Sequence, residues 1–273
     1  MKTLNNHIIL YDAECPMCKL YTGQFIKRGM LGAGCRAPYQ QMPETVCPYV
    51  NRQRAVNEIA LVNTETGEVE YGVKSLLKVI ANSFPVFGPL FSFRPFTWLM
   101  EKAYGFVSYN RRVIAPSASD QHNTIDPTFS LKHRIAYLAF TWLMVGFILT
   151  HYAYLLTAFV PLGNHYREYA ICGGQILFQG IIVNLYAYKK RWDYLGNMMT
   201  ISFAGALLLA PVILISHYIH FWPIVYPAYF MLVAGLMFLE HIRRTRLLKL
   251  GWLLTISWTF YRIIILLLIL NLI

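Results

Sequence analysis

The feature that most constrains this chain is a series of long apolar stretches in its second half. A helix that crosses a bilayer needs about 20 predominantly apolar residues. Five stretches come close to or exceed that length: Arg134–Val160, Tyr169–Tyr188, Leu195–Tyr218, Ile224–Leu239 and Gly251–Ile273. They predict an all-α transmembrane bundle of about five helices over residues 133–273. Because the connecting loops are short, consecutive helices should pack against each other.

Composition and charge agree with a membrane protein. The chain is 56% apolar and only 14% charged, whereas soluble domains carry about 25% charged residues. Its formal net charge is +11, but no basic stripe marks a soluble face of the kind that binds nucleic acid. We therefore expect a lipid bilayer as a partner and no nucleic acid. Composition leaves the oligomeric state open.

The loop charges predict the orientation of the bundle. Two alternate loops hold seven basic residues: Lys189, Lys190, Arg191, Arg243, Arg244, Arg246 and Lys249. The other two loops hold only Arg167. Because positive loops stay inside, we expect an integral protein of the bacterial inner-membrane type, with a cytoplasmic N-terminal domain and Ile273 on the opposite side. The first residues also lack the apolar core of a secretory signal peptide, which gives the same expectation.

One charge lies deep inside a predicted span. Arg262 is in the middle of the fifth stretch, and a charge at that depth is a candidate for function. The alternatives are that it snorkels to the interface or pairs with Glu240 at the end of the fourth stretch. A third neighbour is the polar face of the second stretch, formed by Gln175, Gln179 and Asn184. Haem or metal ligation is not indicated by the spacing of three outer histidines, His151, His217 and His220.

The first 115 residues predict a small α/β domain. His7–Tyr11 is an apolar run typical of a buried strand, and it is followed by a turn and then a helix that starts at Cys15–Cys18 with Pro16 in its first turn. The remaining predicted elements are a hairpin of Glu58–Val62 and Val69–Tyr71, a helix over Gly72–Ala81 and one more strand near Arg36–Gln40. A Cys-x-x-Cys motif beside such a strand–helix unit is typical of thioredoxin-like redox domains.

The spacing of the cysteine pair suits dithiol chemistry. A helix N-terminus stabilises a thiolate, so Cys15 is expected to be the attacking thiol. Cys18 lies one turn away, within reach to resolve a mixed disulfide. Asp12 is close enough to influence proton transfer, although a turn residue at the helix entry would look the same.

These residues resemble a known family. Tyr11, Asp12, Cys15 and Cys18 form the Tyr-Asp-x-x-Cys-x-x-Cys signature of the DCC family of thioredoxin-like proteins, and Tyr104 through Arg112 resembles that family's closing Tyr and Asn-Arg element. The resemblance covers roughly His7 to Ala115 and implies thiol-disulfide oxidoreductase activity. Thioredoxins carry a cis-proline before their third strand, whereas the run Ala55–Ile59 has none, which leaves open how a substrate disulfide docks.

The other cysteines are Cys35, Cys47 and Cys172. A four-cysteine zinc site is one alternative for the soluble pair, but such sites use two tight pairs and the second spacing here is loose. We expect ordinary packed cysteines, no structural disulfides in a reducing compartment and no cofactor.

The predicted organisation is a thioredoxin-like domain over residues 1–115, a linker over 116–132 and the membrane domain over 133–273. The aromatic segment Phe84–Tyr109 either lies on the membrane surface or packs onto the thioredoxin-like core.

Two functions fit this organisation. The first is a membrane-bound thiol-disulfide oxidoreductase that exchanges disulfides with an unknown redox partner at the cytoplasmic face. The alternative is a membrane transport, binding or assembly protein whose thioredoxin-like domain is regulatory or structural, since five spans exceed what anchoring requires. A dithiol relay across the membrane is not supported, because the predicted spans contain only Cys172.

Overall fold

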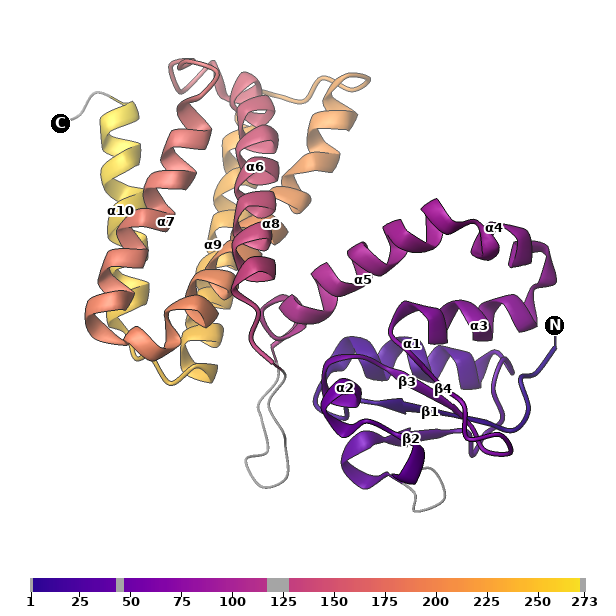
Figure 1. Cartoon of the computed structure of the whole chain (residues 1–273). Coiled ribbons are helices and arrows are strands. Elements are labelled where there is room, and N and C mark those ends of the chain that lie inside the picture. The colour runs from indigo at the N-terminus through magenta and orange to yellow at the C-terminus, as the bar shows by residue number, and fades with distance from the viewer. Residues whose placement is uncertain (1, 43–46, 117–127, 271–273) are drawn as a thin grey trace. The chain divides into compact units, whose positions relative to one another are not determined.

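The computed structural model describes residues 2–42, 47–116 and 128–270. The chain divides into two compact units, Met1–His133 and Arg134–Ile273 (Figure 1). The first is mixed α/β and the second is helical, which confirms the predicted fold class.

The N-terminal unit is built on a four-stranded mixed sheet. Its strands are β1 (His7–Tyr11), β2 (Arg36–Pro38), β3 (Ala60–Asn63) and β4 (Val69–Tyr71), in the order β2-β1-β3-β4. β1 is parallel to β2 and antiparallel to β3, while β3 and β4 form an antiparallel pair. The predicted central strand, the hairpin and the additional strand near Arg36 are all present.

Helices cover both faces of this sheet, which explains why its central strands are almost continuously apolar. Ile9 and Leu61 pack on the face covered by α1 (Pro16–Lys27) and α3 (Val73–Ser83). Leu10 and Val62 pack on the other face, against α2 (Arg52–Asn57). Successive residues of β1 therefore point into different cores, and β1 is fixed between them.

The aromatic segment after α3 is helical. It forms a 3₁₀ turn, η3 (Pro85–Phe87), a short helix, α4 (Gly88–Ser92), and a long helix, α5 (Arg94–Ile114). The second half of α5 is buried against the sheet domain, with Asn110, Arg111 and Val113 almost fully covered. In the second half of α5 the structure therefore shows packing onto the core of the α/β domain, one of the two alternatives for this segment.

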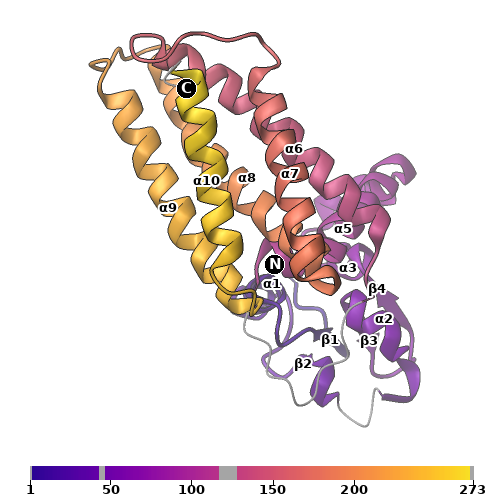
Figure 2. The ribbon, with the colours of Figure 1, turned by 90° about the vertical axis from the view of Figure 1, so that its left-hand side faces the viewer.

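The C-terminal unit is an antiparallel helical bundle (Figure 2). Four of its helices are long and apolar enough to cross a membrane: α6 (Leu131–Ala153, continued by a 3₁₀ turn), α7 (Arg167–Tyr186), α8 (Arg191–Ser216) and α9 (Val225–Leu247). The fifth, α10 (Leu253–Ile269), is apolar but has 17 residues. α10 lies beside α7 and α9, and Tyr194, Met198, Leu254 and Trp258 are buried at the centre of the bundle.

The ends of two helices differ from the sequence expectation. α9 continues to Leu247, so Arg243 and Arg244 lie on the helix rather than in a loop. Glu240 stabilises this extension, because its carboxylate accepts hydrogen bonds from both arginines, three and four residues further along. α6 starts at Leu131, inside the segment expected to be a linker, and residues 117–127 of that segment lie outside the described residues.

Candidate redox site

Cys15 is the N-cap of α1. Its backbone is extended, with φ −88° and ψ 109°, and its sulfur accepts the backbone N–H of Cys18 at 3.3 Å. Pro16 occupies the first helical position, where no N–H is needed. The motif thus places the first sulfur at the N–H groups of the helix start, as the spacing predicts.

The two thiols differ in their proton affinity. The hydrogen bond from the Cys18 side chain lowers the pKa of Cys15 to about 7, and the Cys18 backbone N–H and the charge of Arg111 act in the same direction against the effect of burial. The same hydrogen bond and burial raise the pKa of Cys18. Both side chains are buried and reduced. These shifts favour ionisation of Cys15 over ionisation of Cys18.

Asp12 lies at the entry to the motif, just after β1. One carboxylate oxygen accepts the backbone N–H of Glu14 at 3.0 Å and the side-chain amide of Gln40 at 2.9 Å. The other accepts a guanidinium N–H of Arg111 at 2.8 Å. These contacts fit the turn-residue alternative, and they tie the turn to two other parts of the domain.

Arg111 comes from the far end of the domain. Its terminal nitrogens donate to Asp12, to the carbonyl of Val56 at 2.6 Å and to the carbonyl of Asn57 at 3.3 Å. Its side chain is 5% exposed and that of Asp12 is 2% exposed, so the ion pair is shielded from solvent. Arg111 therefore links the turn before the cysteine motif to the segment that enters β3.

Two further residues of α5 hold the same segment. Ser108 donates to the carbonyl of Asn57 at 2.5 Å, and the backbone N–H of Ile59 donates to the hydroxyl of Tyr104 at 3.0 Å. Tyr104, Ser108 and Arg111 share one face of the helix by their spacing. The described residues contain no cis peptide bond. Side chains of α5 thus fix the segment where thioredoxins use their cis-proline.

Sequence reasoning assigned no role to Arg111 or Tyr104 beyond the family resemblance. A signal was present, because Tyr104, Ser108 and Arg111 form a polar stripe at helical spacing in an otherwise aromatic segment. The sequence did not indicate that this stripe contacts the segment Val56–Ile59.

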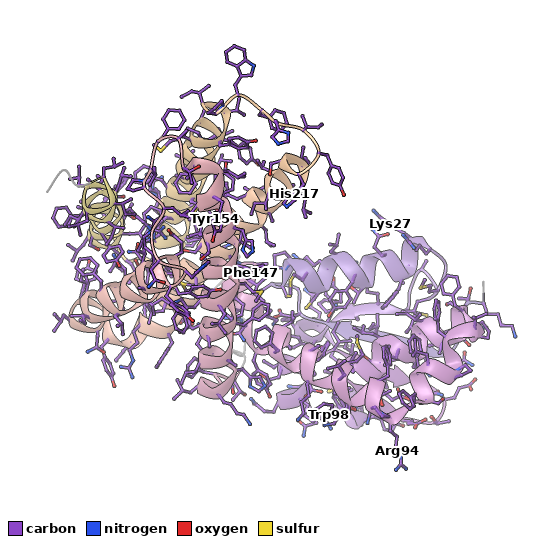
Figure 3. The ribbon with its side chains drawn as sticks, turned by 90° about the horizontal axis from the view of Figure 1, so that it is seen from above. Lys27, Arg94, Trp98, Phe147, Tyr154 and His217 are labelled. Atoms are coloured by element: carbon purple, nitrogen blue, oxygen red, sulfur yellow. The ribbon has the colours of Figure 1, made fainter. Side chains whose placement is uncertain are left out.

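The exposed side of α1 borders a shallow hollow of about 550 Å³, and Pro16 of the cysteine motif is one of the residues that line it. Its lining includes three basic residues, Lys19, Lys27 and Arg36. Lys27 projects outward from the domain (Figure 3). The surface beside the motif is therefore positively charged and open.

The other cysteines lie apart from this pair. Cys35 packs in the core between α1 and the sheet, and the sulfur of Cys47 contacts Arg52 at 3.3 Å. Cys172 is buried between helices of the bundle. Over residues 2–42, 47–116 and 128–270, no three His, Cys, Asp or Glu side chains are grouped so that they could hold a metal ion.

In the bundle, Arg262 contacts the second span rather than Glu240. Its Nε donates to the side-chain oxygen of Gln175 on α7 at 2.7 Å, and its guanidinium carbon lies 5.3 Å from the ring centroid of Trp258. Within the described part of the chain, the amide nitrogen of Gln175 and the indole nitrogen of Trp258 are buried and have no hydrogen-bond partner. Two buried N–H donors, of Gln175 and Trp258, therefore lie beside the Arg262 guanidinium without an acceptor among the described residues.

The acids of the bundle are engaged elsewhere. Glu168 pairs with Arg167 at 2.9 Å and Asp193 with Arg134 at 3.4 Å. Glu240 pairs with Arg243 and Arg244 at 2.6 and 2.7 Å. Gln179 joins helices, accepting from Tyr194 at 2.8 Å and donating to Ser257 at 3.1 Å. His151, His217 and His220 are exposed on the unit and are not brought together into a site.

Comparison with known proteins agrees with the geometry of the N-terminal unit. Residues 9–115 match the family model described as DCC1-like thiol-disulfide oxidoreductase. No curated protein and no solved structure matched the chain. The matched range runs from β1 to the end of α5, so it includes both cysteines, Asp12 and Arg111. Residues 9–115 thus match a DCC1-like thiol-disulfide oxidoreductase domain, and they are followed by helices that are long and apolar enough to cross a membrane.

Proposed function

We propose that this protein is a membrane-bound thiol-disulfide oxidoreductase in which Cys15 is the attacking thiol and Cys18 the resolving thiol. The observation that carries the proposal is the sulfur of Cys15 at the start of α1, where it accepts the N–H of Cys18 and has a pKa of about 7. Near pH 7 about half of such a thiol is ionised, against a few per cent of an ordinary cysteine.

The first step is attack by the Cys15 thiolate on one sulfur of a partner disulfide. A bond forms between Cys15 and that sulfur, the partner's S–S bond breaks, and the second partner sulfur leaves as a thiolate that takes up a proton. In the second step Cys18 loses its proton and attacks Cys15. The Cys15–Cys18 disulfide forms and the first partner sulfur is released as a thiol. Two electrons pass from the dithiol to the partner, and the reverse sequence oxidises a partner dithiol.

Arg111 supports both steps as a positioning residue. Its charge lowers the pKa of Cys15 and also that of Cys18 against the larger effects that raise it. The thiolate that must form on Cys18 during resolution is therefore favoured by the same guanidinium. Asp12 opposes this effect at Cys15 and holds Arg111 in place.

The partner is expected at the cytoplasmic face of the membrane. Support comes from the basic residues at one set of helix ends, such as Lys190 before α8 and Arg246 near the end of α9, against Arg167 at the other. The alternating direction of the five helices supports the same orientation, with the N-terminal unit inside and Ile273 outside. A reporter fused after Ile273 should report a position outside the cytoplasm. A reporter that reports a cytoplasmic position would contradict this orientation.

The exchange reaction is tested with the full chain in lipid nanodiscs. The reduced protein should reduce hydroxyethyl disulfide and acquire a Cys15–Cys18 disulfide, detected by mass spectrometry. Cys15→Ser should abolish the reaction. Cys18→Ser should stop at a mixed disulfide on Cys15 that dithiothreitol releases. A wild-type protein that remains fully reduced in excess disulfide would refute the proposal.

We propose as a second candidate function that the bundle itself binds a lipid-soluble anionic ligand, such as a long-chain carboxylate, at Arg262. The supporting observation is the cluster of donors around this residue. Gln175 and Trp258 contribute buried N–H groups that have no acceptor in the part of the bundle that the structure describes. An anionic oxygen would satisfy these donors and balance the charge, which Glu240 does not do because it pairs with Arg243 and Arg244.

A further inference from the structure

The N-terminal unit exposes a group of large apolar side chains that its own core does not use. They belong to η3, α4 and the first turns of α5, and are called here the aromatic face: Phe84, Val86, Phe87, Leu90, Phe93, Trp98 and Leu99. Val86 is 87% exposed, Trp98 60% and Leu99 58%. Soluble domains rarely leave this many neighbouring apolar side chains in water, and such patches mark interaction sites.

The aromatic face is an ordered surface. Successive rings contact one another, from Phe84 to Phe87 at 6.3 Å between centroids, then to Phe91 at 5.9 Å and on to Phe96 at 6.0 Å. The second half of α5 is fixed in the domain through Tyr104 and the residues that follow it. The exposed half therefore projects from a helix that is held at its other end, and no folding step is needed before it binds.

The charges around the aromatic face are mainly positive. Arg94 and Trp98 point outward at the same edge of the unit (Figure 3), and Lys102 lies 5.8 Å from the ring centroid of Trp98. The one acid of this segment, Glu101, is paired with Lys74 at 3.1 Å. Aromatic and leucine side chains beside basic groups are the composition of segments that lie in the interface of an anionic bilayer.

The C-terminal unit keeps the aromatic face close to a bilayer. Four helices of the C-terminal unit are long and apolar enough to span a membrane, and only 16 residues lie between the end of α5 at Ile114 and the start of α6 at Leu131. Even a fully extended segment of that length reaches about 55 Å. The N-terminal unit therefore remains near the membrane surface, where tethering raises the local concentration of a weakly binding face.

We propose that the aromatic face lies in the headgroup and upper acyl layer of the bilayer, with its apolar side chains buried and Arg94 and Lys102 at the lipid phosphates. Pro85, Pro89 and Pro95 stand in the first turns of η3, α4 and α5. They divide residues 85–99 into separate helices, so this stretch lies along the surface and does not cross. Docking of this kind limits the orientations in which the redox site can meet a partner.

The test uses the full chain in nanodiscs that contain anionic phospholipid and a phospholipid with a photoreactive diazirine on its acyl chain. After irradiation, mass spectrometry should find lipid adducts on residues 84–99 as well as on the helices of the bundle, and none on β3 and β4. The double variant Val86→Asp, Leu99→Asp should lose adducts on residues 84–99 by at least about tenfold, because two apolar side chains no longer favour insertion.

Leu20→Asp is the matched control. Leu20 is an exposed apolar residue of α1, 68% exposed, and its replacement should leave the adducts on residues 84–99 unchanged. Unchanged hydrogen exchange of the β1 and β3 amides in every variant shows that the domain still folds. If residues 84–99 carry no lipid adducts while the helices of the bundle do, the aromatic face does not lie in the bilayer and the proposal is overturned. The test does not depend on whether the cysteines exchange disulfides.

Discussion

Arg111 and Asp12 are 99 residues apart in the sequence, yet the guanidinium of one contacts the carboxylate of the other at 2.8 Å in a shielded ion pair beside the Cys-x-x-Cys motif. The pair joins the last helix of the N-terminal unit to the turn after its first strand. Because Arg111 also donates to Val56 and Asn57, one side chain connects the three segments that surround the two cysteines.

Removal of Arg111 is predicted to destabilise this region strongly. Arg111→Met leaves the Asp12 carboxylate buried without its partner, which costs about 3–5 kcal/mol. Backbone amides of residues 56–62 should then exchange hydrogen about a hundredfold faster or more in the full chain. Arg112→Met is the control, because Arg112 is part-exposed and pairs with Glu14 at 3.4 Å. Equal exchange rates in the two variants would show that the buried pair carries no special weight.

The same pair is predicted to set the ionisation of Cys15 in opposite directions. The charge of Arg111 lowers the pKa of Cys15 and that of Asp12 raises it. Arg111→Gln should therefore raise this pKa, and slow alkylation of Cys15 at pH 7 by about three- to tenfold. Asp12→Asn should lower it and speed alkylation at pH 6. If both variants shift the titration in the same direction, the electrostatic account of the site is wrong.

Tyr104 is predicted to matter through its hydroxyl alone. It accepts the backbone N–H of Ile59 at 3.0 Å, and Tyr104→Phe leaves that buried N–H unsatisfied at a cost of about 1–3 kcal/mol. Hydrogen exchange at the start of β3 should rise about tenfold. Tyr109→Phe, on the same helix, removes a hydroxyl for which no hydrogen bond is found among the described residues, and should have no such effect. A silent Tyr104→Phe would mean that the β3 entry is held by Ser108 and Arg111 alone.

Arg262 separates the two candidate functions. If the bundle binds an anionic ligand there, oleate should raise the melting temperature of the wild-type protein and methyl oleate should not. Arg262→Leu should lose this response while Cys15 still titrates normally. Arg246→Leu changes an arginine at the membrane edge, 5.4 Å from the ring of Trp252, and should keep it. An equal response of all three proteins to oleate would leave the bundle as an anchor. In an anchor, Arg262→Leu should cost little stability, because an apolar side chain can replace a buried charge at little cost.

Much of the N-terminal fold follows from local patterns in the sequence. The apolar run His7–Tyr11, the proline in the first turn after Cys15 and the turn between β3 and β4 each act within a few residues, so their elements can be predicted. The long apolar runs predict the helices of the bundle for the same reason. Hydropathy falls at Glu240 and so ends the fourth apolar stretch at Leu239, whereas α9 continues to Leu247 on ion pairs of Glu240 with Arg243 and Arg244.

The contacts that complete the sites are the part the sequence could not give. Arg111 with Asp12 and Arg262 with Gln175 join residues 99 and 87 positions apart. No periodicity encodes such pairs, because they depend on how helices pack in three dimensions. Glu240 was a reasonable partner for Arg262 by depth, but closer arginines on its own helix engage it.

We infer that Cys15 is activated by its place at the start of α1 and by the thiol of Cys18. The decisive measurement is the pH dependence of iodoacetamide alkylation at Cys15 in the full chain in nanodiscs, quantified by mass spectrometry for each cysteine. A half-maximal rate at pH about 7 is expected, because that is the pKa of Cys15. Cys18→Ala removes the largest cause of the shift and should move the midpoint upward, whereas Cys18→Ser keeps an O–H donor and should move it less. A wild-type midpoint near pH 8.5, the value of a free cysteine, unchanged by either substitution, would contradict the account.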